Sequence, residues 1–343
     1  MKIGIWRVLF LASFSASLIV SGSCGSNTSG FVQSYNAAAN IGDLLNVTVD
    51  TGALTYSYQF LQGDLAGVKG AGTLTRNDSS AANIFSTSDG FPLVAIQNEV
   101  VIGQIGSDFY LGVPTSTSPV SVTDLVGVYN YVRFFPAGTS ANPLDTSNFG
   151  TLKMNADGTW QVAEQSNLGV KGTPILNGTY NLGSNGIVEL FIVVNNGAVK
   201  LANLALRTNS SGQHFVVVDF TDTGIAKGIG FGQKQAGTYV ASGDVDGNYT
   251  AIFGNGSLDQ GSVKGTQLNI QAVGNFPSIS YTLTYNNPWP GLITGTSIIP
   301  GFGKASFTGF YSQGSQSLYG VFTVNATNSL IPPISLPFVA MKN

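Results

Sequence analysis

The sequence predicts an all-β protein, and three observations lead to that prediction. Charged residues make up only 9% of the chain, against about a quarter in typical soluble domains, so long amphipathic helices have no charged face to present to water. Gly 44, with 35 Ser, 29 Thr and 28 Asn, supplies instead the residues of tight turns. Apolar and polar residues alternate with a period of two over 54–60 and again over 281–285. We therefore expect antiparallel meanders of short strands that form two barrel- or sandwich-like domains.

The turns between these strands have their own signature, the Asx-Gly dipeptide. Asn-Gly and Asp-Gly supply the positive φ angles of two-residue hairpin turns. Seven such dipeptides predict a meander: Asp89-Gly90, Asp157-Gly158, Asn177-Gly178, Asn185-Gly186, Asn196-Gly197, Asp246-Gly247 and Asn255-Gly256.

A Gly-x-Tyr pattern recurs at irregular spacing, ending at Tyr129, Tyr180, Tyr239, Tyr249 and Tyr311. The irregular spacing argues against a solenoid or propeller and favours a strand-start motif, in which glycine permits a bend and the tyrosine hydroxyl lies at the rim. Residues 149–160 read as a hairpin and resemble the hairpins of lipocalin-like bacterial envelope domains. That resemblance implies a lipocalin-like architecture and no activity.

One stretch favours a domain boundary. Residues 114–119 read Pro-Thr-Ser-Thr-Ser-Pro, a composition typical of an extended, solvated linker. We expect an N-terminal β domain over 31–113, a linker over 114–120 and a C-terminal β domain over 121–343.

The N-terminus predicts export. Lys2 and Arg7 precede an apolar run over 8–20 that is too short to span a bilayer comfortably. The single cysteine, Cys24, follows this run and resembles the acylated cysteine of a bacterial lipobox, although Ser21 stands where such boxes usually carry Leu. We expect residues 1–23 to be a lipoprotein signal peptide and 24–30 a tether; by the same resemblance, Gly25 favours the outer membrane. The alternative is an ordinary signal peptide with Cys24 incidental.

The whole chain resembles the uncharacterised lipoproteins of betaproteobacteria that form a domain-of-unknown-function family. The resemblance rests on the signal with Cys24, on the strand pair over 49–60, and on the block from 127 to 160. It implies a location in the cell envelope and supplies no activity.

Two Asp-Thr-Gly tripeptides, at Asp50 and Asp222, are the strongest catalytic candidates. Pepsin-like aspartic peptidases present one such loop from each of two β-rich lobes, and the two carboxylates share a proton. The resemblance is incomplete: Thr221 replaces the usual hydrophobic residue, and Ile225 stands where those enzymes carry Ser or Thr. Two β-turns are the favoured interpretation, and a peptidase is the alternative.

Other chemistry finds less support in the sequence. The only histidine, His214, opens an apolar run, and neither a zinc site, a calcium loop nor a phosphate loop is complete. We predict no cofactor and no metal, and the low content of Lys and Arg excludes a basic nucleic-acid binder. A proline-rich loop with Tyr285 and Trp289 is the candidate recognition surface for a protein or glycan.

Three function classes follow from these observations. The favoured one is a non-enzymatic envelope lipoprotein with a binding or structural role. The alternatives are the aspartic-type peptidase and an outer-membrane β-barrel, which low charge and alternating strands suggest.

Overall fold

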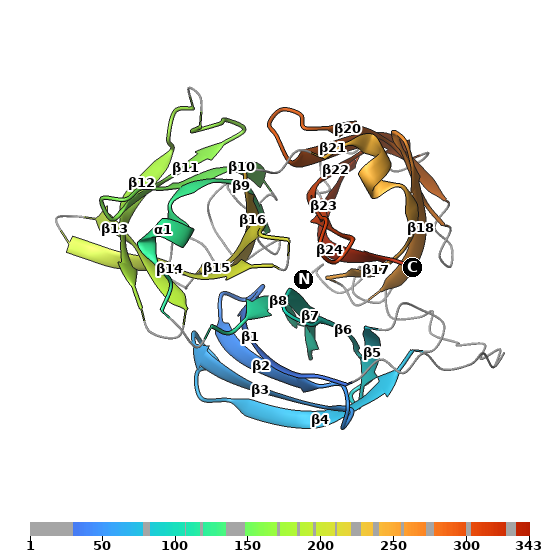
Figure 1. Ribbon diagram of the computed structural model, residues 1–343, viewed down its shortest axis with the longest axis horizontal. Coiled ribbons are helices and arrows are strands. Elements are labelled where there is room, and N and C mark those ends of the chain that lie inside the picture. Colours follow the sequence, from blue (N-terminus) through green and yellow to red (C-terminus); the bar gives the residue numbers. More distant parts are fainter. Residues whose placement is uncertain are drawn as a thin grey trace, which may run out of the picture.

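The structure is a computed structural model that describes residues 30–77, 83–106, 108–116, 119–134, 148–169, 172–183, 186–194, 197–209, 211–220, 228–235, 240–254, 257–271, 278–299, 303–326 and 334–343. Within these residues the fold is all-β, as predicted: three closed, antiparallel, eight-stranded barrels follow one another along the chain and surround a common centre (Figure 1).

Each barrel is a meander whose last strand pairs with its first. The first consists of β1 (Val32–Ala39), β2 (Leu44–Asp50), β3 (Thr55–Gln62), β4 (Lys69–Arg76), β5 (Ile84–Thr87), β6 (Pro92–Ile96), β7 (Val100–Ile105) and β8 (Asp108–Pro114). The second consists of β9 (Gly127–Phe134), β10 (Asn148–Met154), β11 (Thr159–Glu164), β12 (Leu176–Leu182), β13 (Ile187–Val194), β14 (Gly197–Thr208), β15 (His214–Phe220) and β16 (Gly228–Lys234). The third consists of β17 (Gly247–Phe253), β18 (Leu258–Lys264), β19 (Gln267–Ile270), β20 (Ile279–Tyr285), β21 (Leu292–Ile299), β22 (Gly303–Ser312), β23 (Ser317–Ala326) and β24 (Ile334–Lys342).

The number of barrels differs from the expectation of two domains. Residues 121–343, expected as one domain, contain two closed barrels, because β16 pairs with β9 and β24 pairs with β17. No proline-rich linker marks the division between them in the sequence.

The second and third barrels begin in the same way. A single helical turn, α1 (Val122–Leu125) or the 3-10 helix η1 (Ser242–Val245), precedes the first strand of each barrel. The Tyr129 hydroxyl donates to the Leu125 carbonyl over 2.8 Å, and the Tyr249 hydroxyl donates to the Val245 carbonyl over 2.6 Å. At these two positions Gly-x-Tyr is the predicted strand-start motif, and its tyrosine ties the helical turn to the barrel. Tyr180 and Tyr311, by contrast, lie inside β12 and β22.

The predicted Asx-Gly turns also fall into two groups, those that form tight turns and one that lies inside a strand. Gly90 and Gly158 lie in tight turns with a φ of 83° each, between β5 and β6 and between β10 and β11, so the hairpin predicted over 149–160 is confirmed. Asn177-Gly178 instead lies within β12, where Gly178 leaves room for the Phe191 carbonyl of β13; a Cβ at residue 178 would lie 1.8 Å from that oxygen.

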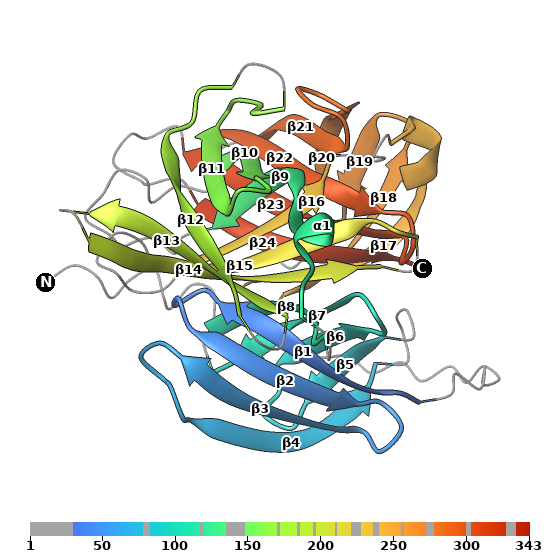
Figure 2. The ribbon, with the colours of Figure 1, turned by 60° about the vertical axis from the view of Figure 1, so that its left-hand side comes forward.

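The barrels share one apolar core where their walls meet. It contains buried residues of all three, among them Ile102 and Leu111, Val217 and Phe231, and Phe310 and Val339. Strands at this centre are buried on both faces and therefore read as continuous apolar runs, as in β8. Outer strands such as β3 alternate buried and exposed residues. Figures 1 and 2 show the first barrel, in blue to teal, packed against the other two.

Each barrel is also apolar inside. The interiors are filled by large side chains, with Tyr35 and Phe60 in the first barrel, Trp160 in the second and Phe307 in the third. Outer-membrane barrels have the opposite arrangement, an apolar outer band around a polar lumen. The apolar interiors thus argue against that alternative.

Candidate functional site

Of the two aspartates proposed for a peptidase, the structure describes Asp50. Asp50 ends β2, and its Oδ1 accepts hydrogen bonds from the backbone N–H groups of Gly52 (2.9 Å) and Ala53 (2.7 Å). This carboxylate therefore caps the turn of its own tripeptide, the role favoured from the sequence. Asp222 and the predicted lipidation site, Cys24, lie outside the described residues.

The predicted recognition loop is corrected by the structure. Trp289 is only 7% exposed and belongs to the core shared by the barrels, where its ring lies 5.6 Å from that of Phe149 in the second barrel. The Tyr285 hydroxyl donates to the Gly265 carbonyl within the third barrel. Trp289 therefore fixes one barrel against another and offers no exposed aromatic surface, because barrel docking buries this side chain while Asn287, Pro288 and Pro290 beside it stay exposed.

Polar groups buried where the barrels meet form two clusters that sequence reasoning missed. In the first, Glu99 of the first barrel accepts hydrogen bonds from Asn209 Nδ2 of the second (3.2 Å) and from Ser312 Oγ of the third (3.2 Å). The Tyr319 hydroxyl of the third barrel also donates to it, over 3.4 Å. Burial raises the pKa of Glu99. One carboxyl group thus joins all three barrels.

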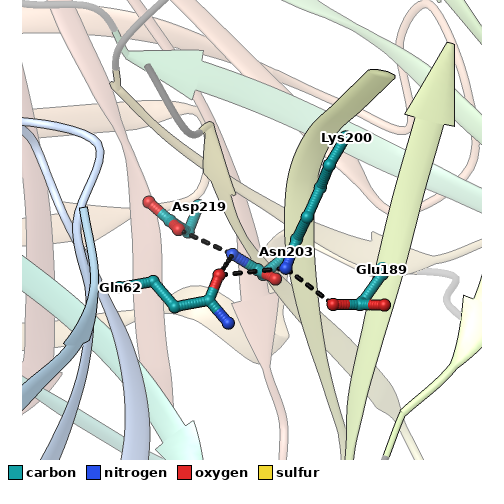
Figure 3. A network of polar contacts seen from close by, with 5 residues as sticks. All are labelled: Gln62, Glu189, Lys200, Asn203 and Asp219. Carbon is teal, nitrogen blue, oxygen red and sulfur yellow. Dashed lines mark hydrogen bonds and ion pairs between the residues drawn. The ribbon is translucent and has the colours of Figure 1, made fainter. Parts of the chain in front are cut away.

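The second cluster lies between the first and second barrels (Figure 3). Gln62 Oε1 of β3 accepts hydrogen bonds from Lys200 Nζ (2.9 Å) and Asn203 Nδ2 (3.1 Å) of β14. Asn203 Nδ2 also donates to Asp219 Oδ2 of β15 over 3.0 Å, and Lys200 pairs with Glu189 at 2.7 Å. The side chains therefore link the two barrels through polar contacts; Asn203 and Asp219 are fully buried, whereas Lys200 and Glu189 are partly exposed.

Asp219 carries the strongest electrostatic perturbation of this cluster. Its side chain is fully buried, and Oδ1 has no hydrogen-bond partner. Burial raises the pKa of Asp219 to about 7; the nearby Asp43 carboxylate adds to the rise, while the Asn203 hydrogen bond and the Lys200 charge oppose it. Both clusters join side chains of different barrels, so we assign them a structural role.

The interior of the third barrel is different because it contains a cavity of about 30 Å³. Its lining is apolar and aromatic, with the rings of Phe253, Phe307, Phe322 and Phe338 in mutual contact. The helical turn η1 packs Val245 into the same core at the end where β17 begins. This space could not be predicted from the sequence, because it depends on which residues the barrel brings face to face.

A single acidic side chain lies on the wall of this cavity. Asp259 of β18 is one of the lining residues, and its Oδ1 is buried without a hydrogen-bond partner. Burial raises the pKa of Asp259 to about 6. The residue as a whole is half-buried, and the surface that the cavity exposes is apolar. This apolar cavity is the candidate binding site.

Other candidate sites have ordinary local roles. His214 begins β15, where its Nδ1 lies 2.8 Å from Thr208 Oγ1. Asp246, part of the incomplete calcium loop, accepts the Gly265 N–H and pairs with Lys264. Among the residues that the structure describes, no group of three or more His, Cys, Asp or Glu side chains is placed to hold a metal ion. None of the helices in this part of the chain has the length and apolar character to cross a bilayer.

Comparisons with known proteins give distant structural neighbours. No protein-family model and no curated protein matches the chain. A double mutant of transferrin binding protein B from Haemophilus parasuis is 10% identical, with 91% of this chain and 76% of that chain covered and a TM-score of 0.30. A single mutant of the same protein gives 9% identity, coverage of 92% and 77%, and a TM-score of 0.26.

A third neighbour is a protein of unknown function from the DUF3598 family of Nostoc punctiforme. It is 15% identical, covers 65% of this chain and 97% of its own, and has a TM-score of 0.19. At these TM-scores the likenesses supply neither a function nor a partner for this chain.

Proposed function

We propose that this chain is a non-enzymatic, lipid-anchored binding protein of the cell envelope that holds a small ligand in the interior of the third barrel. The observation that carries the proposal is the cavity inside this barrel, which is lined mainly by aromatic and aliphatic side chains.

The cavity limits what this site can hold. About 30 Å³ admits only a few non-hydrogen atoms. A glycan ring or a protein partner is too large for it, so any such partner must bind to the outer walls or loops.

The envelope location rests on the predicted signal peptide and on Cys24, whose acylation would tether the three barrels to a membrane. Gly25 favours the outer membrane. Replacement of Cys24 by Ser should abolish labelling by radioactive palmitate and release the exported protein into the periplasmic fraction. Wild-type protein that stays in the cytoplasm, or that exports without incorporating palmitate, contradicts this part of the proposal.

The binding role is tested with xenon, a neutral apolar atom that enters small apolar cavities. The full chain with ¹³C-labelled methyl groups is titrated with xenon under pressure, and the resonances of Leu268 and Leu318, which line the cavity, should shift and saturate. Ala251→Val, which fills the cavity with two methyl groups, should remove the shifts. If the wild-type resonances do not move, the interior is a closed core and the binding role is wrong.

A further inference from the structure

A groove of about 430 Å³ lies on the outer wall of the first barrel, over β3 and its neighbours β2 and β4. Ligand sites in proteins have volumes of about 300–1,000 Å³. Figures 1 and 2 show β3 and β4 on the side of the first barrel that faces away from the other two. Because this side is open to solvent, a ligand can reach the groove without any movement of the barrels.

The register of the three strands explains the shape of the groove. Asn46 on β2 pairs with Gln59 on β3, which pairs with Lys69 on β4, so these polar side chains form one row. Two residues further along, Ser57 on β3 pairs with Ala71 on β4, and both side chains are short. Side chains alternate between the faces of a strand and opposed residues lie about 5 Å apart, so both rows stand side by side on the outer face. The groove is the recess between the longer row and the shorter one.

Contacts inside the barrel hold the floor of this groove in place. The floor is the paired backbone of Tyr58 and Gly70. The Tyr58 ring packs on the opposite face, into the barrel interior, and occupies the place of a side chain at residue 70: a Cβ there would lie 2.6 Å from the Tyr58 hydroxyl oxygen. Asn46 is also held, since its Nδ2 donates to the Tyr35 carbonyl over 3.1 Å. The groove is therefore formed before a ligand arrives, which lowers the entropy cost of binding.

The groove is positively charged in a chain whose net charge is −3. Neither β3 nor β4 contains an Asp or Glu residue. On β2, the outward carboxylate of Asp50 already accepts the N–H groups of Gly52 and Ala53. Lys69 is exposed and forms no ion pair within the part of the chain that the structure describes. Its ammonium group can therefore bind an acidic group of a ligand.

The other groups of the lining match a sugar ring. The amides of Asn46 and Gln59 and the hydroxyl of Ser57 both donate and accept hydrogen bonds, as sugar hydroxyls do. The Ala71 methyl group and the aliphatic stem of Lys69 offer a small apolar surface to the C–H face of such a ring. An extended peptide fits less well, because the barrel is closed and leaves no strand edge for it to pair with.

We propose that this groove binds an acidic saccharide, with the carboxylate of the sugar against Lys69 and the sugar ring over Ala71. The ring hydroxyls exchange hydrogen bonds with the side chains of Asn46, Gln59 and Ser57. This site is separate from the cavity of the third barrel, so the inference goes beyond the proposed function and does not depend on it.

The test compares two sugars that differ in one group, a carboxylate in place of a hydroxymethyl. Methyl glucuronide and methyl glucoside are titrated into the ¹⁵N-labelled full chain at low ionic strength, and the backbone amide resonances of Gly70 and Ala71 report binding. We expect the glucuronide to saturate these shifts at a concentration about fivefold lower than the glucoside, the gain expected from one exposed ion pair. Added salt should remove this difference, since salt screens exposed charges.

Three substitutions locate the effect. Lys69→Gln removes the charge and should lower the affinity for the glucuronide to that for the glucoside, while glucoside binding stays unchanged. Ala71→Leu fills the recess and should abolish the binding of both sugars. Lys304→Gln makes the same charge change at an exposed position of β22 in the third barrel and should bind as the wild type does. All three variants should fold, because the substituted side chains are exposed.

The outcomes separate the ligand class from the site. Equal affinity for the two sugars, or wild-type affinity for the glucuronide in Lys69→Gln, overturns the assignment of an acidic ligand. Failure of both sugars to shift the Gly70 and Ala71 resonances, or unchanged binding in Ala71→Leu, overturns the site itself. The xenon titration of the third barrel is independent of these results, so failure here and failure of the proposed function are distinguishable.

Discussion

The buried Asp219 gives the sharpest prediction about stability. It lies on β15 at the contact between the first and second barrels, where Oδ1 has no partner and Oδ2 accepts one hydrogen bond from Asn203. The Oδ1 atom of Asn203 also lacks a partner. Asp219→Asn removes the charge and brings an N–H donor to this site, so we expect the variant to be more stable than the wild type above acidic pH.

The magnitude follows from the pKa of Asp219. Burial raises it from 3.8 to about 7, and each unit corresponds to about 1.4 kcal/mol. Because the folded pKa is the higher one, the stabilisation is complete below pH 3.8 and is lost as the pH rises toward about 7. The free energy of unfolding should thus fall by up to about 4 kcal/mol across this window, and Asp219→Asn should lack this loss.

The assay is urea denaturation followed by tryptophan fluorescence from pH 4 to 8.5. Trp160 lies inside the second barrel, and Trp289 lies in the shared core, so the signal reports the barrels joined at this site. The difference between wild type and Asp219→Asn should grow with pH and level off near pH 7, while the exposed Asp157→Asn should follow the wild type. Parallel curves for Asp219→Asn and wild type would refute the reasoning.

Three further predictions concern the contacts between and within barrels. Glu99→Ala removes the acceptor that Asn209, Ser312 and Tyr319 share, so calorimetry should show a loss of about 3 kcal/mol; an unchanged Tm contradicts a joining role. Trp289→Ala empties a buried site of the shared core and should reduce the free energy of urea unfolding by about 3–5 kcal/mol; a loss below about 1 kcal/mol would show that the ring is dispensable. Tyr249→Phe removes the hydroxyl that binds η1 and should lower the free energy of unfolding by about 1 kcal/mol. The same urea denaturation measures this loss. Tyr285→Phe, which removes a hydroxyl elsewhere in the barrel, is the matched variant.

The sequence identified what depends on neighbours along the chain. The period of two in residues 54–60 and 281–285 marked strands with one face toward a barrel interior, β3 and β20. The Asp89-Gly90 and Asp157-Gly158 turns were predictable because the positive φ of glycine is a local preference. Strands buried on both faces, such as β8, lack that alternation, so the sequence could show that they are strands but not what covers them.

The candidate site could not be predicted from the sequence, because it too depends on contacts between distant strands. Asp259 stands between Leu258 and Gln260 in the sequence. Only the pairing of β18 with β17 and of β17 with β24 brings Ala251 and Ala340 into its row. Ala340 is separated from Asp259 by about 80 residues along the chain, and no local preference fixes which two distant strands will pair.

Composition and local pattern by themselves determined that this chain is an all-β protein of tight turns, and they supplied the predictions of export and of a lipid anchor at Cys24. Tertiary structure decided that there are three barrels and that Trp289 is buried between them. It also decided that Glu99 joins all three barrels and that the third barrel contains an apolar cavity. The physical reason is range: turn angles and side-chain alternation are set within a few residues, whereas barrel closure and docking depend on contacts between residues far apart in the chain.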